Sequence, residues 1–290
     1  MLGWLDTLLQ GLMLGGLYAL FATGLSLTFG VMRLVNIAHG DLSILAAYLA
    51  LVTVETVGIS PFAALIIVVP LMAVSGYVLQ LFLLNDTLGD DILPPLLVTF
   101  GLSIILQNGL MEVFSADSRG LSVGALQTAS LPLGGGVVVG VFPAITLATA
   151  IAVLALMSWL FNSTTLGRAL RATSDDQTTA QLMGIDNRRL YAIAMAISMA
   201  VVAIAGVFLA IRTTFDPTSG PARLLYAFEA VIIGGLGSLW GTLAGGMVLG
   251  VAQTVGFALS PAWGIAVGHI AFLIVLLVRP NGLFPRTRDA

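Results

Sequence analysis

Apolar runs long enough to cross a lipid bilayer recur along this chain, and they constrain its fold more than any other feature. A spanning helix needs about 20 predominantly apolar residues. The alternation of polar and apolar residues that a spanning strand requires is not sustained in these runs. They lie near residues 5–30, 41–57, 60–84, 94–114, 141–161, 190–211, 226–258 and 261–278. The sequence therefore predicts an all-α fold, a polytopic transmembrane helical bundle of about 8–10 membrane segments, with residues 1–290 as a single domain.

Composition excludes several classes of function. Only 9% of the residues are charged, against roughly 25% in soluble domains. The chain has no lysine, and a P-loop requires a Gly-Lys pair, so any ATP-driven work must be done by another subunit. The net charge of −3 gives no reason to expect a nucleic-acid partner. No group of His, Asp or Glu has the spacing of a metal site, so we expect no metal. Because the chain has no lysine and no P-loop, we expect it to have no ATPase site of its own and not to be an enzyme.

The most highly charged part of the chain is the segment 163–190. It holds seven of the 25 charged residues, 11 basic and 14 acidic. One such residue at the bilayer centre costs about 2.5–3.5 kcal/mol, so the segment must lie in water. It also holds four of the eleven arginines, and the tail 279–290 holds three more, Arg279, Arg286 and Arg288. By the positive-inside rule we expect both the segment and the tail to be cytoplasmic.

Start and stop signals inside this segment predict a short surface helix. Ser174 and Gln177 fit a capping box, which would place Asp175 and Asp176 in the first turn. The helix would continue to Met183 and end at Gly184. So short a helix needs packing, either against its own domain or against a partner, and the residues alone leave both open.

The apolar sequence is interrupted at two places. The need for one of these interruptions follows from a count of crossings. Three runs separate segment 163–190 from the tail, and an odd number of crossings would place the segment and the tail on opposite sides of the membrane. Residues 229–250 contain seven glycines, and Gly234–Gly235 predicts a break in the middle of the membrane. The spacing of Gly237, Gly241 and Gly245 favours close helix packing. A half-helix here would repair the count.

The other break, at residues 29–41, contains Asn36, His39 and Asp41. Two interrupted segments in corresponding halves, with weak internal similarity, indicate a transporter built from a repeat, with its pathway between the breaks. We expect Asp41 to cap the next helix. Asn36 and His39 could equally line the pathway or be structural.

Three further features have alternative interpretations. Glu229 could face the pathway or pair with Arg223 or Arg212, and His269 is expected to be a packed histidine. The segment 115–140 would lie outside and could carry a small hairpin or cap. The acidic loop around Asp86 would lie on the cytoplasmic side.

Four stretches resemble permease subunits of ABC importers in the LivH group. They are GLYALFATGLSLTFGVMRLVNIAHGD, TTLGRALRATSDDQTTAQLMGI, VIIGGLGSLWGTLAGGMVLG and the terminal RPNGLF, and they follow one another in the same order. The resemblance implies a coupling loop that contacts an ATPase through Arg168, Arg171, Ser174, Asp175, Asp176, Gln177, Gln181 and Gly184. It also implies a pathway near Asn36, His39, Gly40, Glu229, Gly234, Gly235 and Gly237.

The resemblance further implies partners and a location. These are two LivG/LivF-like ATPase subunits that hold ATP and Mg²⁺, a second permease that is LivM-like or another copy, a periplasmic or extracellular binding protein, and membrane lipid. The chain itself would bind no cofactor and would span the bacterial inner membrane. Substrates of the group include branched-chain amino acids, other amino acids, amides, urea and organic acids. A secondary transporter or channel and an intramembrane protease are the alternatives.

Overall fold

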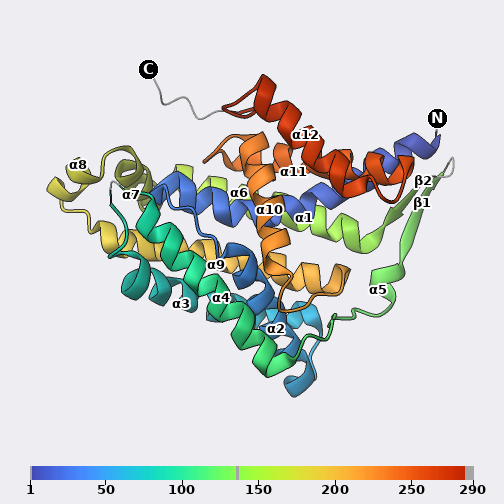
Figure 1. The fold of residues 1–290 in the computed structure, drawn as a ribbon, viewed down its shortest axis with the longest axis horizontal. Coiled ribbons are helices and arrows are strands. Elements are labelled where there is room, and N and C mark those ends of the chain that lie inside the picture. The colour runs from blue at the N-terminus through green and yellow to red at the C-terminus, as the bar shows by residue number, and fades with distance from the viewer. Residues whose placement is uncertain (1, 90, 135–136, 285–290) are drawn as a thin grey trace.

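The structure, a computed structural model, describes residues 2–89, 91–134 and 137–284, and helices make up most of this part of the chain (Figure 1). Seven of its helices are long and apolar enough to cross a membrane, which confirms the predicted helical bundle. In chain order the elements are α1 (Leu2–Met32), α2 (His39–Val57), α3 (Pro61–Leu79), the π-helix η1 (Gln80–Leu84), α4 (Leu93–Phe114), α5 (Ala125–Thr128), β1 (Ser130–Gly134), β2 (Val137–Gly140), α6 (Val141–Ser163), α7 (Thr165–Asp175), α8 (Gln177–Leu182), α9 (Asn187–Arg212), α10 (Gly220–Gly234), α11 (Leu239–Leu259) and α12 (Gly264–Val278).

Helix α1 lies at the centre of the bundle and packs against α6, α9, α10 and α11. In its most hydrophobic stretch 83% of the residues are buried, against 17% in α4. A helix this long and apolar on all sides is stable only where other helices or lipid surround it. Helices α1 and α9 therefore form the core, while α3 and α4 present apolar faces outward.

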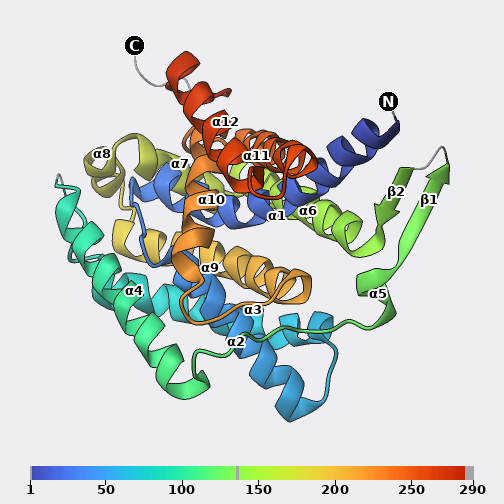
Figure 2. The same ribbon diagram turned by 45° about the vertical axis from the view of Figure 1, so that its right-hand side comes forward.

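The contacts of α1 define two ends of the bundle. Near its start, Gln10 donates a hydrogen bond to the Val138 carbonyl of strand β2, at 3.0 Å. Near its finish, the Gly30 carbonyl accepts a hydrogen bond from the Ser174 hydroxyl of α7, at 2.6 Å. We call these the hairpin end and the charged end; the two lie on opposite sides of the molecule in Figures 1 and 2.

The apolar run 226–258 folds as two antiparallel helices, α10 and α11. The turn between them contains Gly235 and Gly237, both with positive φ, at 101° and 76°. Close by, the Trp240 indole donates a hydrogen bond to the Ser158 hydroxyl near the finish of α6, at 3.4 Å. The predicted break is confirmed, but the turn lies at the charged end and not in the middle of the membrane. Helix α10, only 15 residues long, is the half-helix that the count requires, and the tail returns to the charged end, where Gly282 lies against Gly235.

Helix α11 uses glycines on two faces. A Cβ atom at Gly241 or Gly245 would overlap the backbone of α10, and one at Gly246 or Gly250 would overlap the backbone of α1. Small residues let helix backbones approach closely where lipid supplies no hydrophobic driving force. The predicted close packing is therefore confirmed for Gly241 and Gly245. Gly237 belongs to the turn.

The segment 115–140 covers the hairpin end. Its strands β1 and β2 pair antiparallel, as the expected hairpin. The backbone of Arg119 pairs with that of Phe215, and the Leu121 amide donates to the Ala210 carbonyl, at 2.8 Å. The segment therefore lies over the finish of α9, opposite the charged end.

Candidate functional site

The charged segment forms two short helices at the charged end, where the sequence predicts one. Helix α7 ends at Asp175, and Asp176 is the N-cap of α8, accepting hydrogen bonds from the amides of Thr178 and Thr179 at 2.9 and 3.0 Å. The Thr179 hydroxyl also donates to this carboxylate, and these bonds hold the pKa of Asp176 below its ordinary value. The predicted capping box at Ser174 is wrong.

Two of the predicted coupling residues are anchors of the segment. The Ser174 hydroxyl donates to Gly30 of α1, which is why it is not available as a cap. The Arg171 guanidinium donates to the Phe161 carbonyl at the finish of α6. Gly184 follows the end of α8 with a φ of 82°, the left-handed conformation typical of a glycine that ends a helix, as predicted. A side chain that holds the segment to the bundle is not free to contact a partner.

The remaining predicted coupling residues lie on the exposed side of the two helices, together with two apolar side chains that the sequence analysis did not select. Leu182 is 82% exposed and Met183 is 80% exposed. Large apolar groups on a surface outside the lipid indicate a contact site. We call the following exposed group the coupling surface: Arg168, Asp175, Asp176, Gln177, Gln181, Leu182, Met183 and Gly184. The signal that could have found Leu182 and Met183 is their position directly before Gly184 in an otherwise polar helix.

A side chain of α9 fixes the inner side of the coupling surface. Asn187 is buried; its amide nitrogen donates to the Gln177 carbonyl at 2.9 Å, and its amide oxygen accepts from the Thr173 hydroxyl at 3.3 Å. The neighbouring Arg188 forms an ion pair with Asp86, at 2.7 Å. The acidic loop therefore lies at the charged end, as expected.

A cavity of about 520 Å³ lies beneath the coupling surface. One wall is formed by Ser174, Asp175 and Gln177, and another by Met32 and Arg33 at the finish of α1. Arg33 has a φ of 53°, a left-handed conformation unusual for a residue with a side chain. The cavity thus connects the coupling surface to the first break.

The first break folds back beside α1. The Asn36 side chain accepts a hydrogen bond from the Ala38 amide at 3.0 Å, and His39 Nε2 donates to the Phe21 carbonyl at 2.9 Å. Both side chains are fully buried. Phe21 lies eleven residues before the finish of α1, so α2 begins deep inside the bundle. Asn36 and His39 hold this bend, and a role for them in lining a pathway stays a prediction.

Asp41 does not cap α2, because the helix already begins at His39. Its carboxylate is buried and accepts a hydrogen bond from Ser103 of α4, at 2.5 Å. A Cβ at Gly40 would overlap the backbone of Gly220. The start of α2 and the start of α10 therefore touch inside the bundle. The first break, at residues 29–41, is thus in contact with α10, the helix that leads into the second break at Gly234–Gly235.

The second break is closed by the tail. The amides of Leu283 and Phe284 donate to the carbonyls of Ile233 and Gly234, at 2.8 and 3.1 Å. These carbonyls at the finish of α10 have no partner within the helix. The stretch RPNGLF therefore caps α10, and Gly282 lies directly against Gly235. Residues 285–290 of the predicted cytoplasmic tail, with Arg286 and Arg288, lie outside the described residues.

Glu229 is buried in α10, and its partner is His269 of α12. The alternative of an ion pair with Arg223 or Arg212 is wrong, because the ion pair of Glu229 in the structure is with His269. His269 is accordingly more than a packed histidine. Its contact joins residues 40 positions apart, which no local pattern in the sequence reveals.

These features together are those of a membrane transport subunit. They are the apolar helices long enough to cross a membrane, the two breaks connected through α2 and α10, and the anchored surface with exposed apolar side chains. The family described as the branched-chain amino acid transport system permease component matches residues 7–278. The chain belongs to this family.

Several permeases are similar to the chain over almost its whole length. It is 29% identical over 300 residues to the high-affinity branched-chain amino acid transport system permease protein BraD of Pseudomonas aeruginosa, covering 98% of this chain and 96% of BraD. It is 29% identical to LivH of Salmonella typhimurium, with the same coverage, and 28% identical to the probable LivH of Methanocaldococcus jannaschii, covering 92% of this chain and 88% of that protein. The solved structure PsaBC from Streptococcus pneumoniae in complex with Fab covers 94% of this chain at 15% identity, with a TM-score of 0.48.

Proposed function

We propose that this chain forms half of the membrane pathway of an ABC importer for branched-chain or related small amino acids. Two ATPase subunits that hold ATP and Mg²⁺ supply the energy, a second permease completes the pathway, and a soluble binding protein delivers the substrate. The support is membership of the permease family and similarity to branched-chain amino acid permeases over 98% of the chain. The chain itself binds no nucleotide in this scheme, because it has no lysine for a P-loop.

The observation that carries the ATPase contact is the pair Leu182 and Met183 on the coupling surface. Both are more than three-quarters exposed, although the residues around them are anchored to α1, α6 and α9. A rigid surface loses little conformational entropy on binding, so exposed apolar groups held in place favour association. A partner that covers them removes apolar area from water at about 25 cal/mol per Å².

The orientation follows from the arginines. Four of them lie in segment 163–190 and one in the described part of the tail, all at the charged end. With the charged end in the cytoplasm of a bacterium, the start of α1 and the β1–β2 hairpin lie outside. The binding protein then docks at the hairpin end, and the ATPases dock at the charged end.

The double variant Leu182→Ser, Met183→Ser tests the coupling surface. The complete transporter is purified through its ATPase subunits and reconstituted into proteoliposomes, where ATP-driven leucine uptake is measured. We expect loss of both co-purification and uptake, since the substitutions remove the apolar contact but leave every described anchor in place. The control is Leu126→Ser in α5, an exposed leucine at the hairpin end, which should bind the ATPases normally.

Normal co-purification and normal uptake by the double variant would show that the ATPases do not bind at this surface. Leucine uptake by the chain alone, without ATP, would instead indicate a secondary transporter or channel. In that case the substitutions of Leu182 and Met183 would leave transport unchanged.

A further inference from the structure

A polar cluster inside the bundle has more hydrogen-bonding capacity than its own side chains use. Its members come from four helices: Tyr18 of α1, Arg212 of α9, Arg223, Tyr226 and Glu229 of α10, and Gln253 of α11. We call it the arginine–tyrosine cluster. Polar groups inside a membrane are costly and are a sign of function.

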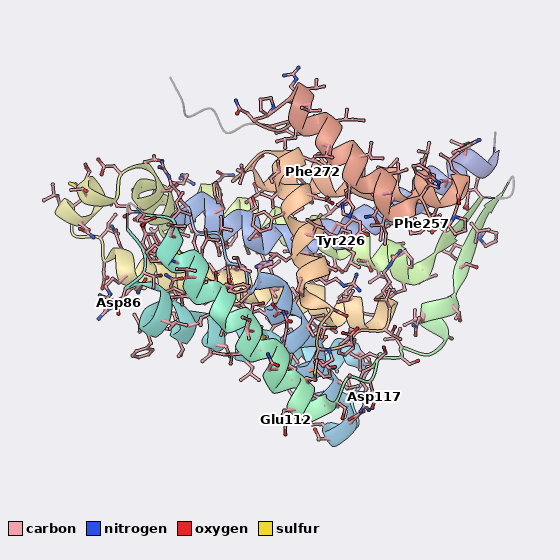
Figure 3. All side chains as sticks on the ribbon, in the orientation of Figure 1. Asp86, Glu112, Asp117, Tyr226, Phe257 and Phe272 are labelled. Carbon is pink, nitrogen blue, oxygen red and sulfur yellow. The ribbon has the colours of Figure 1, made fainter. Side chains whose placement is uncertain are left out.

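Direct contacts join the members. The Tyr18 hydroxyl donates to Gln253 Oε1 at 2.5 Å. The rings of Tyr18 and Tyr226 lie 5.0 Å apart. The charges of Arg212 and Arg223 lie close enough to influence the Tyr18 hydroxyl, without a direct contact among those described. The Tyr226 ring also stacks on that of His269, at 6.2 Å between centroids. Figure 3 shows Tyr226 on α10 with Phe272 of α12 beside it.

Four buried polar atoms of the cluster have no hydrogen-bond partner among the described residues. Three are donors, Arg212 Nη1, Arg223 Nε and Gln253 Nε2, and one is an acceptor, Glu229 Oε2. A buried polar group without a partner costs about 1–3 kcal/mol. Four of them in one place are explained if a molecule that supplies the missing partners binds there.

The spare atoms match one kind of ligand. Three donors, two of them on guanidiniums, suit a carboxylate, because Arg binds carboxylates through charge-assisted hydrogen bonds. The spare carboxylate oxygen of Glu229 and the face of Tyr226 suit an ammonium group. Arg223 and Glu229 are six residues apart on α10, roughly 9 Å along its axis at 1.5 Å per residue. Tyr226 lies midway between them, three residues from each, so the three side chains can surround one amino-acid head group.

We propose that the arginine–tyrosine cluster binds the zwitterionic head group of an amino acid on its way through the membrane. The carboxylate contacts Arg212, Arg223 and Gln253, and the ammonium group contacts Glu229 and Tyr226. The proposal rests on the proposed function, since it names the substrate class of that pathway. It places the selection for an amino acid in the membrane subunit as well as in the binding protein.

The cluster's position fits a site that is reached from the hairpin end. Arg212 is the last residue of α9, and Arg223 lies in the first turn of α10. Both are next to the connecting segment 213–219, which the hairpin end covers through the pairing of Arg119 with Phe215. A substrate released at that end meets the guanidiniums first.

Transport with altered arginines is the first test. In the reconstituted transporter, Arg223→Gln and Arg212→Gln should each lower leucine uptake by roughly tenfold or more, with ATP hydrolysis within about twofold of wild type. Arg223→Lys keeps the charge and should retain part of the uptake. Arg119→Gln is the control, because Arg119 lies at the same end but outside the cluster.

Chemical protection of the full chain in nanodiscs is the second test, and it needs no ATPase. Phenylglyoxal modifies arginines, and leucine should slow its reaction at Arg212 and Arg223 but not at Arg119. Leucinamide, which has no carboxylate, should protect neither. Equal protection by leucine and leucinamide, or no protection, would overturn the proposal.

The two tests separate this proposal from the proposed function. Normal ATP-driven leucine uptake by both glutamine variants would refute the binding site but would still support the importer function. If leucine protects the two arginines but the wild type shows no ATP-driven uptake, the binding site is supported and the ATP-coupled mechanism is refuted.

Discussion

The packing of α10 against α11 predicts that Gly245→Ala destabilises the bundle while the same substitution at Gly101 does not. A Cβ at Gly245 would overlap the Ala230 carbonyl oxygen of α10 and lie 2.8 Å from the Gly234 amide nitrogen. These are backbone atoms of a helix, so no side-chain rotation relieves the overlap. A Cβ at Gly101 in α4 meets no atom of the described residues within 4 Å.

The comparison isolates the cost of the overlap. Replacing glycine by alanine inside a helix stabilises it by about 0.5–1 kcal/mol, and this gain applies to both positions. Overpacking costs about 1–3 kcal/mol and applies only at Gly245. The two variants should therefore differ by about 1–3 kcal/mol in the free energy of unfolding, or about 5- to 150-fold in the unfolding equilibrium constant.

Unfolding by SDS in mixed micelles, followed by circular dichroism, measures this difference. Gly101→Ala should unfold at the same SDS fraction as wild type or a higher one, and Gly245→Ala at a lower one. Equal midpoints for the two variants would mean that α10 and α11 are not in backbone contact. The placement of the half-helix α10 against α11 would then be refuted as well.

Three further outcomes are expected. Asp176→Ala should speed hydrogen exchange at the start of α8. The pKa of Asp176 is lower in the folded state, so the stabilisation of wild-type α8 by this carboxylate is complete at neutral pH. It is lost as the pH falls below the ordinary pKa of 3.8 and through the folded pKa. Unchanged hydrogen exchange in the Asp176→Ala variant would contradict the capping role. Gly282→Ala combines a φ of 81° with a Cβ only 2.5 Å from Gly235, so the tail should detach from the turn. Hydrogen exchange at the amides of Leu283 and Phe284, which bond to the end of α10, should then be faster than in wild type. Ser103→Ala removes a donor to the buried Asp41 carboxylate and should lower stability to SDS by about 1–3 kcal/mol, a loss that Ser103→Thr should restore in part.

The helices were the most predictable feature, because lipid leaves the backbone few alternatives. A polar group that lacks a partner in the bilayer costs several kcal/mol, so each long apolar run must form a helix. The run at 141–161 corresponds to α6, at 141–163, and the run at 94–114 to α4, at 93–114. The sequence did not reveal where α10 begins, because its first turn contains Arg223 and lies before the apolar run.

The caps show how a local signal loses to a distant contact. Ser174 fits a capping box, but its hydroxyl bonds to Gly30, 144 residues away. Asp176 then takes the capping role, so the predicted helix begins two residues later, as α8, and is preceded by a separate helix, α7, that was not predicted. Asp41 fails as a cap for the opposite reason, because a local turn at Asn36 starts the helix three residues earlier than expected, with Ala38 instead of Asp41 at the N-cap.

The candidate site was only partly predictable, because its charged groups are paired across the fold. The local pattern correctly placed segment 163–190 on a surface and the break at Gly234–Gly235. It did not reveal that Glu229 contacts His269 or that Tyr18 bonds to Gln253. Each of these contacts joins helices distant in sequence, and only the packing of α1, α10, α11 and α12 brings them together.

The anchors of the coupling surface also determine where a movement there is transmitted. Ser174 bonds to α1, Arg171 bonds to the finish of α6, and Asn187 of α9 bonds to the Gln177 carbonyl of α8. A partner that displaces the surface therefore pulls on three membrane helices at once. Two of them, α1 and α9, are the core, and α1 leads directly into the first break. The chain thus has a continuous mechanical connection from the coupling surface to the interior, as the proposed ATP-driven mechanism requires.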